Sequence, residues 1–226
     1  MSGSGIYGPS TTSSSLVTPA LALLAQDNPP QIDSVALDFL LIELVQTLKA
    51  SSRHATVRLR AKEEEMINAG LLPPPLPPPP SKDGSSKEDE EEEDALRLRL
   101  EDVGASVGGA LAERLSKDKA RFPDTLDAIK FICKDLWSAA WAKQVDNLRT
   151  NHRGVYVVQD NAFKPLLRLS SPSGNADALK QARLFVAVPT GIIRGALGRL
   201  GLTVSVTPEV LNLPQCTFQI KLPKGQ

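Results

Sequence analysis

Ser106 is the residue whose surroundings most resemble a catalytic motif. It lies in Gly104-Ala105-Ser106-Val107-Gly108, which matches the Gly-x-Ser-x-Gly of a hydrolase nucleophile elbow. An elbow needs a strand before the serine and a sharp turn at it, whereas the apolar residues on either side keep a helical spacing. We therefore expect these small residues to serve helix packing and predict no catalytic residue. A hydrolase at Ser106 is an alternative that Ser106→Ala would test.

Other chemistry-bearing residues give no coherent site. Gly195, Gly198 and Gly201 do not fit Gly-x-Gly-x-x-Gly, and no predicted strand precedes them. The remaining candidates lie on separate predicted elements without paired metal-ligand spacing: His54, His152, Cys133 and Cys216. We predict no metal and no cofactor. We also predict no nucleic-acid partner, because the basic residues are scattered and not interleaved with aromatic ones.

Composition divides the 226 residues into a tail, a domain and an insert. Residues 1–30 are rich in Ser, Thr and Pro, and we expect a disordered tail. Residues 31–226 fit a single domain, interrupted at about 70–95 by a low-complexity insert that runs from prolines to acids. A spacer role suits the prolines better than SH3- or WW-type docking, and we expect the acidic run to be flexible.

The overall charge of zero hides an asymmetry between this insert and the domain. The acidic run from Glu88 to Asp94 leaves a basic body, which could face anionic lipid, an acidic partner or its own insert, or could be ordinary surface charge. Two cysteines suit a reducing compartment. Neither a basic-flanked leader nor a run of eighteen apolar residues occurs, so we expect a cytosolic protein.

Two helices are predicted on either side of the insert. Residues 35–48 carry apolar side chains on more than one face, which indicates burial on two sides. Residues 55–69 extend or restart this helix, with Gly70 as its stop. A second helix over 95–119 has a face of small residues, including Gly104 and Gly108, that lets another backbone approach closely. We expect the two helices to be antiparallel.

The segment from Arg121 to Phe163 combines a helix with a hairpin. Apolar residues at steps of three and four predict the helix, and two β-prone runs flank a turn at residues 151–154. We expect a further strand within 162–169, a helix over 175–200 kinked at Pro189, and two final strands. The predicted fold class is α+β, a twisted antiparallel sheet of about four strands with helices on one face.

The chain also resembles a known family over much of this length. The similarity is carried by Phe131 to Trp137, Asp146 to Tyr156, Leu100 to Gly104, Gly191 to Gly195 and Cys216 to Gln219. These stretches are similar to the small, bet-three-like subunits of the TRAPP (transport protein particle) complex, of the subtype numbered six in animals and thirty-three in yeast. The fold of that family is the one predicted above.

The resemblance implies a non-catalytic architectural subunit that forms a heterodimer with a bet-three-type subunit. It implies further TRAPP subunits as partners, a Rab GTPase served only through guanine-nucleotide exchange by the assembled complex, and peripheral attachment at cis-Golgi and ER–Golgi membranes. We expect the dimer to bury the apolar face of 35–48 and the small-residue face of 103–115. The predicted interface residues are Leu37, Leu40, Leu41, Leu44, Leu48, Val103, Val107 and Leu111.

A different class of function is an acyl- or lipid-binding module at membranes. A related TRAPP subunit carries an acylated cysteine in a hydrophobic channel, and Cys133 is the candidate equivalent here. Its place in an apolar helical stripe favours a buried structural cysteine.

Overall fold

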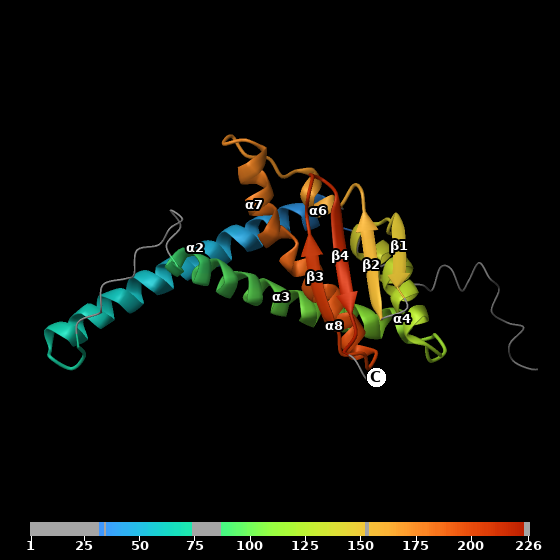
Figure 1. Ribbon diagram of the computed structural model, residues 1–226, viewed down its shortest axis with the longest axis horizontal. Coiled ribbons are helices and arrows are strands. Elements are labelled where there is room, and N and C mark those ends of the chain that lie inside the picture. Colours follow the sequence, from blue (N-terminus) through green and yellow to red (C-terminus); the bar gives the residue numbers. More distant parts are fainter. Residues whose placement is uncertain (1–31, 34, 74–86, 152–153, 224–226) are drawn as a thin grey trace, which may run out of the picture. The chain divides into compact units, whose positions relative to one another are not determined.

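The computed structural model describes residues 32–33, 35–73, 87–151 and 154–223, with the backbone alone for 87–91. Residues 37–226 form one compact body and residues 1–36 a separate unit. The elements of the described chain, drawn in Figure 1, are the helices α2 (Val35–Asn68), α3 (Lys87–Ser116), α4 (Thr125–Phe131), α5 (Trp137–Trp141), α6 (Lys164–Leu167), α7 (Asn175–Phe185) and α8 (Ala187–Arg199), the π-helical turn η2 (Ile132–Leu136), and the strands β1 (Asn147–Asn151), β2 (Val155–Asp160), β3 (Ser205–Glu209) and β4 (Cys216–Lys221).

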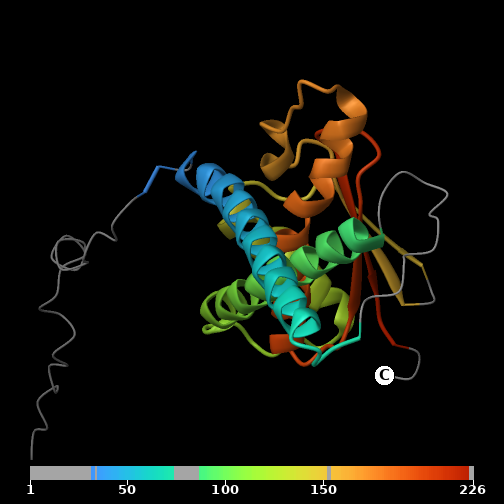
Figure 2. The same cartoon turned by 90° about the vertical axis from the view of Figure 1, so that its left-hand side faces the viewer.

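Four strands of the described chain form one antiparallel sheet in the order β1-β2-β4-β3. Val158 lies opposite Phe218, and both are buried on the same face because paired residues of an antiparallel ladder share a side. Gln159 and Thr217, on the other face, are half-buried. Figure 2 shows the helices gathered on one side of the sheet. The α+β prediction is confirmed, including the hairpin of β1 and β2.

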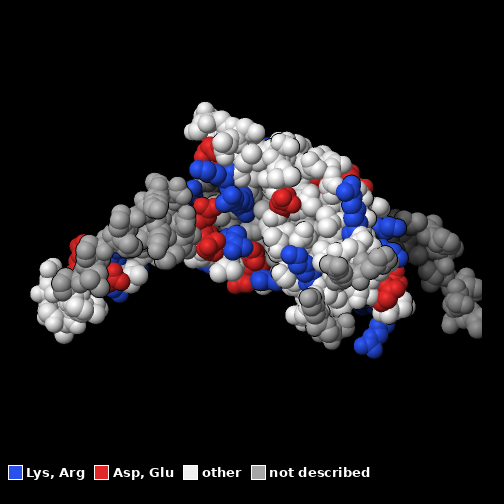
Figure 3. All heavy atoms as spheres, viewed as in Figure 1, with Lys and Arg blue, Asp and Glu red and all other residues white. Residues whose placement is uncertain are grey.

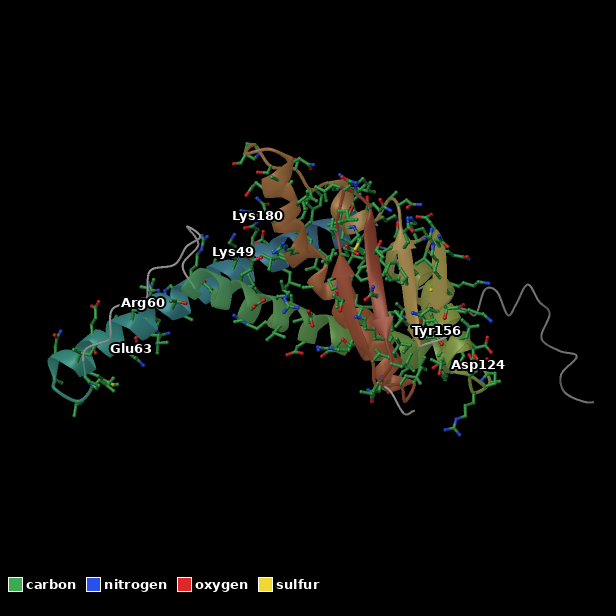
Figure 4. All side chains as sticks on the ribbon, in the orientation of Figure 1. Lys49, Arg60, Glu63, Asp124, Tyr156 and Lys180 are labelled. Atoms are coloured by element: carbon green, nitrogen blue, oxygen red, sulfur yellow. The ribbon has the colours of Figure 1, made fainter. Side chains whose placement is uncertain are left out.

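Aromatic packing joins this sheet to the helical segment before it. The Trp137 ring lies 5.6 Å from the rings of Phe163 and Phe218 and 4.3 Å from that of Trp141. Asp124, labelled in Figure 4, is the N-cap of α4, and its carboxylate accepts the Asp127 N–H at 2.7 Å. The predicted single helix is interrupted by η2, so its stripe continues through α4, η2 and α5.

Helices α3 and α8 pack backbone to backbone through reciprocal glycines. A Cβ on Gly104 or Gly108 would overlap the carbonyl oxygens of Val188 and Ile192, and one on Gly191 would overlap that of Glu101. Glycine is therefore the residue that permits this approach. The small-residue face of α3 does serve helix packing. Gly104 and Gly108 of this face are covered by α8 of the same chain, and the partner contact expected for the rest of 103–115 stays a prediction.

The long C-terminal helix is broken at a different place from the one predicted. Helix α7 ends at Phe185 and α8 begins at Ala187, whereas Pro189 lies in the first turn of α8. A proline ring clashes with the carbonyl four residues earlier, here that of Phe185, and a missing N–H costs little in a first turn. The start also differs, because Gly174 with φ 99° is the N-cap and Asn175 is already helical.

Two further expectations are corrected. Residues 164–167 form the short helix α6 and not a strand, with Pro165 in its first turn. The acidic run is helical from Lys87, because glutamates are good helix formers and favour the positive end of the helix dipole. The two predicted helical stretches of residues 35–69 are one continuous helix, α2. The expected tail at 1–30 and most of the proline run fall outside the described residues.

Candidate functional site

An apolar groove lies where α2, α3, α5 and α8 meet. It has a volume of about 290 Å³ and is lined by Leu37, Leu40, Leu41, Leu44, Val103, Val107, Leu111, Ala139, Ala140, Trp141, Val188, Pro189 and Ile192. Its lining therefore contains no ionisable side chain. Such a surface can hold apolar groups, and it offers nothing that could transfer a proton or bind an ion.

The groove brings together most of the predicted interface residues. All of them except Leu48 line it, and Leu48 is half-buried against the core. The exposed fractions are 40% for Leu37, 62% for Leu40 and 44% for Val107, whereas Leu41 is buried. Contiguous exposed apolar side chains of this kind mark surfaces that contact another molecule.

The glycine contacts between α3 and α8 set the width of this groove. Because Gly104 and Gly108 have no side chain, α8 can approach α3 closely. Val188 and Ile192 of α8 then line the groove together with Val103 and Val107 of α3. The walls from α5 and α8 were not predicted. Trp141 follows the same apolar stripe as the core residues, so its spacing could not distinguish a groove wall from a core position.

Polar contacts hold α2 in position over the groove. Arg168 Nε donates to Asp38 Oδ2 at 3.0 Å and so ties the start of α2 to the end of α6. Arg99 of α3 donates to the Ser52 hydroxyl at 3.1 Å. On the far side of α3, Arg97 and Arg194 both approach the buried Glu101 carboxylate, at 2.9 and 3.7 Å. Arg168–Asp38, Arg99–Ser52 and Arg194–Glu101 join different helices, and none of these six residues lines the apolar groove.

Cys133 does not belong to the groove. It lies in η2 and is 4% exposed, and burial raises the pKa of its thiol to about 12. Cys216 is also buried, and burial together with the nearby Asp160 carboxylate raises the pKa of its thiol. Thiols are nucleophilic as thiolates, so both cysteines are poor nucleophiles in the folded chain.

The remaining residues singled out in the sequence are dispersed. Ser106 is exposed in the middle of α3, and its hydroxyl donates to the Asp102 carbonyl at 3.2 Å, as a helical serine does. No strand leads into it, so the elbow geometry is missing. His54 is exposed on α2, and His152 lies outside the described residues. Gly195 belongs to the α3–α8 contact, and Gly201, with φ 87°, follows the end of α8.

A buried polar cluster was not predicted. Asp160 is fully buried and accepts the Trp137 indole N–H at 2.9 Å, the Lys143 ammonium at 2.5 Å and the Ala162 N–H at 3.0 Å. All the donors belong to this chain, so the cluster has a structural role, joining the helical segment to the end of β2. The alternation of β2 places Asp160 on the buried face with Val158, and this is the feature that could have revealed it.

The described residues contain neither a cluster of metal ligands nor a helix that could cross a membrane. No three His, Cys, Asp or Glu side chains in the described ranges are grouped as metal ligands would be. Among the helices described here, none has the length and hydropathy needed to cross a bilayer.

Comparison with known proteins identifies the family. Residues 37–223 match the model of the transport protein particle (TRAPP) component family, so the chain belongs to that family. Trafficking protein particle complex subunit 6B of Mus musculus is 48% identical over 126 residues, which cover 56% of this chain and 78% of that protein. Subunit 6A of Homo sapiens is 48% identical over 126 residues, covering 56% of this chain and 77% of that protein.

Within the family, the chain is a small subunit of the type numbered six. An uncharacterized protein of Schizosaccharomyces pombe is 32% identical over 199 residues, covering 88% of this chain and 67% of that protein. A solved structure of trafficking protein particle complex subunit 3 from Naegleria fowleri, covalently bound to palmitic acid, aligns with a TM-score of 0.49 and 14% identity, covering 78% of this chain and 97% of that one.

Proposed function

We propose that this TRAPP subunit is a non-catalytic, architectural component that forms a heterodimer with a bet-three-type subunit through the apolar groove. The observation that carries the proposal is the groove itself, in which α2 and α3 leave Leu37, Leu40 and Val107 substantially exposed. An obligate partner surface is expected to be apolar at its centre. Covering these side chains would supply the burial that this chain lacks by itself.

The wider role follows from membership of the complex. The heterodimer takes its place beside other TRAPP subunits, and guanine-nucleotide exchange on a Rab GTPase is a property of the assembly. The working location is cytoplasmic, peripheral at cis-Golgi and ER–Golgi membranes, in vesicle tethering and ER-to-Golgi transport. The subunit itself needs no cofactor for this role, since its contribution is a surface.

Charge placed in the groove tests the proposal. Leu40→Glu and Val107→Glu should weaken a co-expressed complex with the bet-three-type subunit by roughly thirty-fold or more each, because a buried carboxylate would have no partner there. The control is Val57→Glu, on the same helix α2 and 67% exposed, outside the groove lining. Isothermal titration or surface plasmon resonance would measure the affinities. Groove variants that bind as tightly as the parent chain would refute the proposal.

The alternative is an acyl- or lipid-binding module. The apolar groove favours it, whereas Cys133 weighs against it, because the thiol is buried, lies outside the groove lining and has a pKa near 12. At neutral pH this thiol is therefore protonated and a poor nucleophile. Native mass spectrometry of the purified chain decides between the two: an acyl adduct lost in Cys133→Ser supports the alternative, and an unmodified mass removes it.

A further inference from the structure

A second groove lies between α7 and the edge strand β3. It has a volume of about 740 Å³, and its lining includes Ala176, Leu179 and Val186 on one side and Thr207 to Leu211 on the other. Leu211 is 70% exposed at its end. The apolar groove and this one share no lining residue, so a partner that covers only the apolar groove would leave this surface open.

Basic side chains form the rim of this second groove. Lys180 and Arg183 of α7 and Arg97 of α3 line it, against one acidic residue, Glu209. Figure 3 shows Lys and Arg side chains where α7 and α3 approach β3, with Asp and Glu side chains among them. Arg97 bonds to Asp94 and Glu101 of its own helix, so its charge is largely matched.

The two α7 cations are differently placed. Lys180 and Arg183 are both exposed, and no ion pair of Arg183 occurs within the described ranges of the chain. Lys180 has Asp177 one turn away on α7. Lys180 and Lys49 of α2, both labelled in Figure 4, line the same cleft beside α7. Two exposed cations beside apolar side chains suit a ligand that is both acidic and aliphatic.

No other part of this chain supplies such a ligand. Residues 1–31 contain one charged residue, Asp27, and residues 74–86 contain one of each sign, Lys82 and Asp83. The acidic run is already built into the start of α3, where Glu92 and Glu93 line a neighbouring cleft with Lys49, Arg53, Asp177 and Lys180. Lys180 therefore has acidic neighbours on that side, whereas Arg183 has no ion pair within the described ranges, and a carboxylate for it would come from another protein.

The backbone of β3 limits how that protein can bind. β3 is an edge strand, which commonly recruits a further strand, but Pro208, its fourth of five residues, has no N–H to donate. Recognition therefore depends on the side chains of the groove. We propose that the α7–β3 groove docks an acidic segment with aliphatic side chains from a partner protein, its carboxylates on Lys180 and Arg183 and its aliphatic groups against Leu179 and Leu211.

A synthetic peptide tests this directly. The probe is a fluorescein-labelled peptide of Glu and Leu, compared with peptides in which Gln or Lys replaces Glu, measured by fluorescence anisotropy on the full chain. The Glu peptide should bind best, and more weakly as salt rises. The double variant Lys180→Glu/Arg183→Glu should weaken its binding by roughly tenfold or more. Leu211→Asn should weaken binding of the Glu peptide without changing its salt dependence.

The matched control is Lys117→Glu/Arg121→Glu, which makes the same change in net charge at exposed positions outside the groove. Equal loss in both double variants would overturn the proposal by showing a general charge effect. The proposal would also be overturned if the peptide did not bind while anionic phosphatidylserine vesicles bound and lost binding in the same variants. Self-association measured by sedimentation, if lost in Lys180→Glu/Arg183→Glu, would overturn it as well. Affinity for the bet-three-type subunit should be unchanged, so this test and that of the heterodimer fail independently.

Discussion

Helix α8 and helix α2 both pack near α3, but by different means. The α3–α8 contact is made by backbone, with glycines on both sides and no room for a methyl group. Within Val35–Asn68 of α2, the buried residues are Leu41 and Val45, and polar bonds such as Arg168–Asp38 supplement them. The first contact is complete within the chain, whereas the second leaves apolar side chains exposed. The difference places α8 in the core and leaves α2 with exposed apolar side chains, which the proposed heterodimer would cover.

Closing the gap between α3 and α8 should have the largest effect. Gly108→Leu puts a side chain where the Ile192 backbone lies, and we expect it to destabilise the fold by more than about 3 kcal/mol or to prevent folding. Urea denaturation followed by circular dichroism would measure the change.

Gly198→Ala is the control for that substitution. No atom lies within 4 Å of the Cβ it would add, and alanine favours a helix over glycine by up to about 1 kcal/mol. Gly198→Ala should therefore leave stability unchanged or raise it. If Gly108→Leu were equally well tolerated, the tight α3–α8 contact would be disproved.

Truncating one leucine on each helix should give an intermediate effect and sharpen the contrast. Leu100 of α3 is fully buried, and Leu100→Ala should cost about 3 kcal/mol. Leu41→Ala on α2 should cost less, about 1–2 kcal/mol, because one side of Leu41 faces the groove. Denaturation of the isolated chain and of the complex would measure the loss in the free energy of unfolding for each of the two variants. The cost of Leu41→Ala should rise in the complex, and equal costs for both variants in the isolated chain would contradict a loosely held α2.

Removing the polar tie should have the smallest effect. Arg168 is half exposed, so Asp38→Asn should cost about 0.2–1 kcal/mol, with less effect at high salt. In Asp38→Asn, hydrogen exchange should show faster amide exchange at the start of α2 and an unchanged rate at α8. Faster exchange across the whole chain would mean that α2 is part of the cooperative core.

Patterns that depend on local periodicity were predictable from the sequence. The alternation of β2 and β4 and the stripe through Leu136 and Trp137 specify a sheet face and the helix that covers it. The resemblance to the family and the apolar residues of 35–48 led to every α2 and α3 residue that lines the groove. The spacing of these residues along each helix places them on one face, and that face can be identified without knowing which other element packs against the helix.

Features that depend on distant contacts were not predictable in the same way. The small face of α3 indicates a close neighbour but not which one, and that neighbour proved to be α8, more than 80 positions away in sequence. The sequence near Pro189 shows that a helix is disturbed, whereas the position of the break depends on the carbonyl of Phe185. Asp160 could not be paired with Trp137 and Lys143 before the fold had brought them together.

The reciprocal glycines have a consequence for biosynthesis. The groove requires α8 beside α3, and α8 emerges from the ribosome only after most of the chain has been made. A nascent or prematurely terminated polypeptide therefore displays the α2 leucines without the opposite wall. A subunit that docks into the finished groove, as proposed here, would bind complete copies and not fragments that lack α8.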